Sequence, residues 1–120
     1  MDRKYESILT SIKKLLGITD ECTDFDADII IHINTVFMTL TELGVGPTEG
    51  FRIEDKTSNW DEYVSEKDDL DAIKTYVYLK VKLLFDPPLN SAIIESIKES
   101  TRELEWRINH QVEFKDVEEV

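Results

Sequence analysis

Two helical patterns separated by the short segment Asp86-Pro87-Pro88 constrain the fold of this chain most strongly. In the first pattern, apolar residues recur every three or four positions and so share one helix face: Leu70, Ile73, Val77, Val81 and Leu84. Proline has no backbone donor and disfavours a helical residue before it. We therefore predict a helix that ends near Phe85, followed by a hinge at Asp86, Pro87 and Pro88.

A second long helix should follow the hinge, because Asn90 or Ser91 can accept a hydrogen bond from a free amide of the next turn. Its stripe repeats the same spacing: Ile94, Ile97, Thr101, Leu104 and Ile108. So short a hinge favours an antiparallel or sharply angled pair. Trp106 lies off the stripe and is either an interface anchor or a side chain that the tertiary fold buries.

The N-terminal half contains two further helical patterns, over residues 3–17 and about 25–43, each followed by a glycine that can close a helix (Gly17 and Gly44). The lysines of the first helix are either solvated or meet an acidic neighbour. The second helix should bury a stripe widened by aromatic and sulfur-containing residues: Ile29, Ile33, Val36, Leu40 and Leu43, with Phe25, Phe37 and Met38. His32 lies among these apolar residues, which favours a buried or half-buried structural role.

Residues 20–28 carry five acids and no basic residue, a composition that raises the question of a calcium loop. The spacing does not fit, because the central glycine and the terminal glutamate of such a loop are missing. We predict instead that Asp24 caps the second helix, with Asp26 and Asp28 in its first turn.

Glycines and a proline punctuate residues 44–60, so we predict a long loop there, of the length that is often functional. The alternation in Phe51-Arg52-Ile53 leaves a short strand or hairpin edge open as the alternative. Trp60 is either a core anchor or an exposed contact. Residues 61–69 should form a short helix or turn, with Asp68 or Asp69 capping the next helix.

Together these patterns predict an all-α fold for a single domain, residues 1–120, with a small bundle of four to five helices. A long loop or short β-hairpin joins the second and third helices. The tail over residues 110–120 is expected either to be flexible or to order on a partner.

The net charge of −12 argues against tight binding to nucleic acid or to an anionic membrane. The single cysteine, Cys22, excludes an intrachain disulfide and fits a reducing cytoplasm. The charged start lacks an apolar signal core, and the run Ile29–Ile31 is too short for a membrane span. We expect a protein made and used in the cytoplasm, or in particles assembled there.

Catalytic patterns are missing from the sequence. His32 and His110 are isolated, no Glu-x-x-His pair occurs, and the chain has no thiol cluster, Walker loop or nucleophile elbow. We therefore predict no enzyme activity, no metal site and no cofactor.

Four segments resemble the head-tail connector (adaptor, or head-completion) proteins of long-tailed phages and prophages of Gram-positive bacteria. They are FDADIIIHINTVFMTLTELGVGP at 25–47, GFRIED at 50–55 with Trp60, IKTYVYLKVKLLFDPP at 73–88 and ELEWRIN at 103–109. They appear in order and cover most of the chain. The resemblance implies a structural subunit of a ring under the portal, which extends the DNA channel and offers a docking surface for the stopper or tail.

The implied partners are therefore the portal protein, a stopper or tail-completion protein and further copies of this chain. About twelve copies would give the ring a net charge on the order of −140, so DNA could pass without sticking. The implied location is the head-tail interface of the virion, assembled in the bacterial host cytoplasm. The alternative is a free-standing acidic regulatory protein, similar to a DNA mimic, that sequesters a basic partner.

Two sets of residues are the candidate site. We expect the portal or a neighbouring subunit to meet Trp106, Arg107 and Phe114. We expect the channel or the next tail component to face an acidic group or the loop before it: Asp61, Glu62, Asp68 and Asp69, or Glu49, Arg52, Glu54, Asp55 and Lys56.

Overall fold

The computed structural model describes residues 5–65 and 68–119, the stretch 112–119 only by the path of its helix. Within these residues the helices are α1 (Ile8–Leu15), α2 (Asp26–Glu42), α3 (Leu70–Phe85) and α4 (Ser91–Glu119), with a short 3-10 helix, η2 (Trp60–Glu62). The all-α prediction is confirmed. Of the two alternatives between the second and third helices, the long loop is confirmed and the β-hairpin is wrong: the described part of the chain contains no strand, only an isolated bridge between Ser7 and Asn59.

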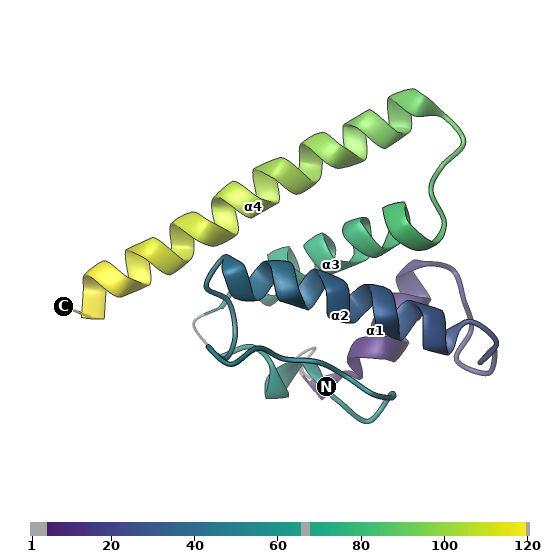
Figure 1. Ribbon diagram of the computed structural model, residues 1–120, viewed down its shortest axis with the longest axis horizontal. Helices are drawn as coiled ribbons and strands as arrows, with labels where there is room; N and C mark the ends of the chain where they lie inside the picture. The colour runs from purple at the N-terminus through teal and green to yellow at the C-terminus, as the bar shows by residue number, and fades with distance from the viewer. Residues whose placement is uncertain (1–4, 66–67, 120) are drawn as a thin grey trace.

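The helices are arranged around α3, which packs against α2 on one side and α4 on the other (Figure 1). Helix α1 packs against α2 and α3, and the 44–60 loop runs back beside α2 toward α1. The C-terminal half of α4 extends beyond the other helices (Figure 1). This helix continues through residues 110–119, the stretch for which the sequence predicts a flexible or partner-ordered tail. Every described helix is too short or too polar to span a lipid bilayer.

Glycine closes the first two helices as predicted. After α1, Gly17 adopts φ 83°, and the amides of Gly17 and Ile18 donate to the carbonyls of Lys14 and Lys13. The same pair of bonds ends α2, with Gly44 at φ 90°. A positive φ is cheap only for glycine, so these two positions set where the helices end.

The starts of α1 and α2 differ from the predictions. Helix α1 begins at Ile8 rather than at residue 3, because the Ser7 side chain accepts from the Thr10 amide and the Ser7 backbone pairs with Asn59. Residues 1–4 lie outside the described part. The predicted Asp24 cap of α2 is wrong: the N-cap is Phe25, which makes no side-chain hydrogen bond there. The acids expected in the first turn are present.

Helices α3 and α4 follow the sequence closely. The Asp69 side chain caps α3 by accepting from the Ala72 amide at 3.1 Å, and the helix ends at Phe85. The Asn90 side chain caps α4 by accepting from the Ala92 amide at 2.8 Å. Thr101 and Ile108 of the predicted α4 stripe are buried. Local chemistry at the prolines and caps is therefore enough to place this helix pair.

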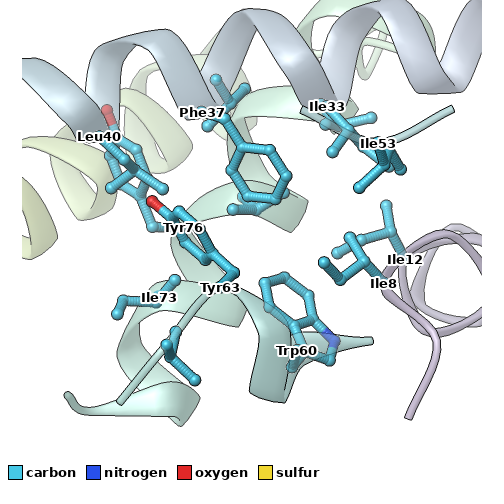
Figure 2. Packing of buried hydrophobic residues seen from close by; sticks show 14 of the residues in the cluster. Ile8, Ile12, Ile33, Phe37, Leu40, Ile53, Trp60, Tyr63, Ile73 and Tyr76 are labelled. Atoms are coloured by element: carbon cyan, nitrogen blue, oxygen red, sulfur yellow. The ribbon is translucent and has the colours of Figure 1, made fainter. Parts of the chain in front are cut away.

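The core gathers around the rings of Phe37, Trp60, Tyr63 and Tyr76, with aliphatic residues from α1, α2 and α3 (Figure 2). Trp60 is fully buried, and its Nε1–H donates to the Ser11 hydroxyl at 2.8 Å. Of the two alternatives for Trp60, a core anchor or an exposed contact, the core anchor is therefore confirmed.

The predicted apolar faces were too wide at their edges. Phe25, Met38 and Leu84 were expected on buried stripes but are exposed, because the described elements that pack on α2 and α3 cover those edges only in part. His32 is half-buried as expected, with its ring 6.3 Å from that of Phe85.

Candidate functional site

The outward face of α4 presents a large aromatic side chain. Trp106 is 68% exposed. It lies two residues from both Leu104 and Ile108, about 200° around the helix, and so opposite the stripe that packs on α3. Its ring stacks on His110, with centroids 5.1 Å apart and planes 5° apart. Arg107 beside it is exposed. The tertiary fold therefore leaves Trp106 on the surface. The side chain of the third candidate, Phe114, lies outside the described residues.

Asn34 of α2 holds loop residues 49–56 against the helix through hydrogen bonds. Asn34 donates from Nδ2 to the Ile53 carbonyl at 2.9 Å and accepts from the Ile53 amide at 2.8 Å. Phe51 adds ring contacts to Phe37 and Tyr63, with centroids 5.4 and 5.0 Å apart. Asn34 thus takes the place that a neighbouring strand would have, which is why the alternating residues stay a loop.

The charged residues of this loop line two hollows that share Ile31. One, of about 390 Å³, which we call the α2 groove, is lined by α2 and residues 49–52: Ile31, Asn34, Met38, Glu49, Phe51 and Arg52. The other, of about 580 Å³, lies between α1, α2 and the three candidates Glu54, Asp55 and Lys56. The structure therefore brings the five candidate residues of the loop to one side of α2.

Asp55 also shapes the loop. Its carboxylate accepts hydrogen bonds from the hydroxyl and the amide of Thr57, the amide at 2.8 Å. The hydroxyl bond first, and then the amide bond, lower the pKa of Asp55, because both stabilise its charged form.

The acidic group at residues 61–69 is largely occupied with backbone capping. The Glu62 carboxylate accepts from the Asn59 amide, Asp68 accepts from the Ser65 amide at 2.9 Å, and Asp69 caps α3. Asp61 is exposed. Residues 66 and 67 lie outside the described part of the chain. These acids are therefore part of the local framework as well as a source of surface charge.

A buried lysine, which the sequence analysis did not single out, organises the acidic run 20–28. Lys13 is 1% exposed, and its Nζ lies 2.9 Å from Asp26 Oδ1 and donates to the carbonyls of Cys22 and Asp20 at 2.8 and 3.3 Å. It thus meets an acidic neighbour, the second of the two alternatives. The sequence signal for the burial of Lys13 was its position four residues after the apolar Leu9. No group of residues that could hold a metal ion occurs among the described residues.

A hydrogen bond between side chains joins α3 to α4. The Tyr76 hydroxyl donates to Glu105 Oε1 at 2.7 Å, and Lys80 lies 3.9 Å from the same carboxylate. Burial first, and then the adjacent Glu105 carboxylate, raise the pKa of Tyr76, because both disfavour the phenolate. This joint fixes the α4 segment immediately before Trp106.

The hinge is held at its first residue. The Asp86 carboxylate lies 3.0 Å from Lys82 Nζ, and the Asp86 amide donates to the Lys82 carbonyl. Phe85 contacts the ring of Phe25 edge-on, with centroids 5.6 Å apart, which ties the hinge end to the start of α2. The hinge of Asp86, Pro87 and Pro88 therefore has a local structural role between α3 and α4.

One comparison with known proteins gives a match. A family model described as "Phage connector protein" matches residues 8–115. No curated protein and no solved structure matches the chain. The matched stretch includes α1, α2, α3 and α4 as far as residue 115, together with the residues that line both hollows.

Proposed function

The chain belongs to the phage connector protein family, and from this premise we propose that it forms a ring under the portal of a DNA-filled head. In this proposal the ring extends the DNA channel and provides the surface on which the stopper or tail docks. The family is a structural one, so the protein is a virion component and not an enzyme. The observation that carries the proposal is the family match over residues 8–115.

The surface chemistry of the chain supports this role. A closed ring of identical subunits needs two unlike surfaces on each copy, because one flank must fit the opposite flank of the next. The chain exposes large apolar side chains on both α2 and α4, among them Met38 and Trp106. Exposed apolar groups of this size commonly mark contact surfaces. In the proposal Trp106, Arg107 and Phe114 meet the portal or a neighbouring copy.

The channel wall is the second part of the proposal. We assign Asp61, Glu62, Asp68 and Asp69 to the channel or to the surface that meets the next tail component. A ring of about twelve copies would repeat these carboxylates around the opening, and their potential would repel DNA phosphates. DNA would then pass without stable binding. The net charge of −12 per chain fits such a wall.

The test of the ring is electron microscopy of the protein mixed with its cognate portal, or with tailless DNA-filled heads. Added ring density below the portal is the expected result. Heads that show no added density at saturating protein would refute the connector role. A small complex that forms only with a basic protein, and weakens steeply with salt, would favour the regulatory alternative instead.

The test of the channel wall is a charge reversal. Asp61→Lys should slow DNA passage or trap DNA in rings that still assemble, because it places a cation beside the phosphates. Glu21→Lys, an equal change at an exposed position before α2, is the control. DNA ejection that is as fast in Asp61→Lys as in the control would contradict the assignment of these residues to the channel.

A further inference from the structure

We infer that neighbouring copies join by inserting Trp106 of one copy into the α2 groove of the next. The inference rests on the proposed ring and assigns its subunit interface. It also places two of the loop candidates, Glu49 and Arg52, against a neighbouring copy rather than in the channel. Four observations carry it: the exposure of Trp106, the shape of the groove, the positions of the two surfaces and their charges.

Trp106 has the properties of an anchor that enters a partner's pocket. Its side chain is 68% exposed, although the chain has a core that could have buried it. Its stack on His110 holds the indole in one orientation before any partner arrives, so little side-chain freedom is lost on binding. A tryptophan of this kind buries about 150–250 Å² when it is covered.

The α2 groove has the properties of the receiving pocket. Ile31 is 61% exposed and Met38 is 68% exposed, and Phe51, which also lines the groove, contacts the core ring of Phe37. The volume of about 390 Å³ lies within the range of pockets that enclose a small organic group. Met38 is unbranched and can adapt to the shape of an entering ring. Asn34, which lines the groove, also holds the adjacent loop through its two hydrogen bonds to Ile53.

The two surfaces lie on opposite flanks of one chain. Helix α3 separates α2 from α4 (Figure 1). Trp106 lies opposite the α4 stripe that packs on α3, because it is two residues from both Leu104 and Ile108. A contact between two such surfaces is heterologous, so each copy keeps one free Trp106 and one free groove until a ring closes. A dimer with twofold symmetry would instead bring the same surface of both copies into contact. The placement therefore points to a second copy in a ring as the occupant.

Charge supports the same pairing. Arg102, one turn before Trp106, and Arg107 are exposed, and Glu49 lines the groove. Because each copy carries −12, two copies repel each other except where opposite charges are brought together. A further pair has the reverse signs: Glu103 lies three residues before Trp106 and Arg52 lines the groove. Each surface thus carries charges that can pair with charges of opposite sign on the other.

Cross-linking tests the geometry directly. In a Cys22→Ser background, Met38→Cys and Arg102→Cys are combined, rings are assembled on the portal, and a short bismaleimide is added. The expected product is a ladder of covalent multimers. The matched control combines Met38→Cys with Thr75→Cys, an exposed position on α3, and should give no ladder.

Substitution tests the energetics. Trp106→Ala should weaken ring assembly about thirtyfold, the loss expected for a central aromatic anchor, and leave the fold intact because the side chain is exposed. Leu89→Ala, at a fully exposed leucine outside both surfaces, should assemble like the wild type. Arg107→Glu should impair assembly, and Glu49→Arg in the same chain should restore part of it.

The outcomes separate this inference from the function on which it rests. Portal-bound rings without the ladder, together with normal assembly of Trp106→Ala, would overturn the interface and leave the connector role intact. A wild-type protein that builds no ring on the portal would overturn both. A ladder, a loss with Trp106→Ala and rescue by the charge swap would establish the interface.

Discussion

Removing the Asn34 side chain should release the 49–56 loop from α2. This residue makes two hydrogen bonds to the backbone of Ile53, which is itself only 1% exposed. In Asn34→Ala both backbone groups lose their partner while Ile53 Cα and side chain stay in the core. The loop must then either leave two buried polar groups unsatisfied or move outward and let water reach them.

The expected cost follows from these two bonds. Each neutral hydrogen bond contributes about 1 kcal/mol net, and the two backbone groups left without a partner, partly hydrated as the loop moves, together add about 1 kcal/mol. We expect the free energy of unfolding to fall by about 3 kcal/mol, which is roughly a 150-fold change in the unfolding equilibrium. That is a large part of the stability of a domain of this size.

The measurement is urea denaturation followed by tryptophan fluorescence, since Trp60 is in the core beside this loop. Hydrogen exchange at the Ile53 amide adds a local probe and should become faster. Thr35→Ala is the control: its hydroxyl donates only to the Ile31 carbonyl of the same helix, and the residue is exposed. A loss of unfolding free energy in Asn34→Ala within about 0.5 kcal/mol of the control, with unchanged hydrogen exchange at Ile53, would refute the role of Asn34 in holding the loop.

Three further results are expected. Gly46→Ala should destabilise the fold more than Gly50→Ala in thermal melts. Both glycines have positive φ (77° and 95°), but a Cβ on Gly46 would lie 2.5 Å from Tyr63 Cε1, whereas none of the atoms around Gly50 is within 4 Å. The strained backbone should cost about 1–2 kcal/mol in each case, the overlap about 1–3 kcal/mol more, and equal costs would contradict the packing. Tyr76→Phe should lower the free energy of unfolding by about 1.5 kcal/mol, because its hydroxyl donates to the Glu105 carboxylate at 2.7 Å; an unchanged urea midpoint would exclude that contribution. Burial raises the pKa of Tyr63 and Tyr76 above the ordinary value, so the unfolded chain loses these protons first and stability should fall as the pH rises above about 10. Tyrosinate absorbance that develops fully before unfolding would contradict this last prediction.

The sequence predicted best what depends on neighbours along the chain. Pro87 and Pro88 end α3 at the predicted residue, and Asn90 starts α4, because a missing donor or a capping side chain acts within one turn. The glycines that close α1 and α2 act in the same local way. The prediction of an Asp24 cap was wrong although it relied on the same capping chemistry, because α2 begins one residue later than that cap requires.

The candidate site was only partly predictable. Trp106 was identified as lying off the α4 stripe, and the structure exposes it. The α2 groove was not foreseen, since Met38 was assigned to the buried stripe. Helical periodicity gives the direction of a side chain around its own helix, but it does not say whether another element covers that direction.

The sequence by itself determined an all-α chain with a proline hinge, the end of α3, the start of α4 and an acidic net charge, because these follow from backbone chemistry and charge count. Only the tertiary structure decided which edges of the helices stay exposed, where Lys13 is buried, and how Asn34 replaces a strand partner for Ile53. These contacts join residues 13 to 19 positions apart in the sequence, or residues of separate helices. They stabilise the fold only after the chain has brought the partners together.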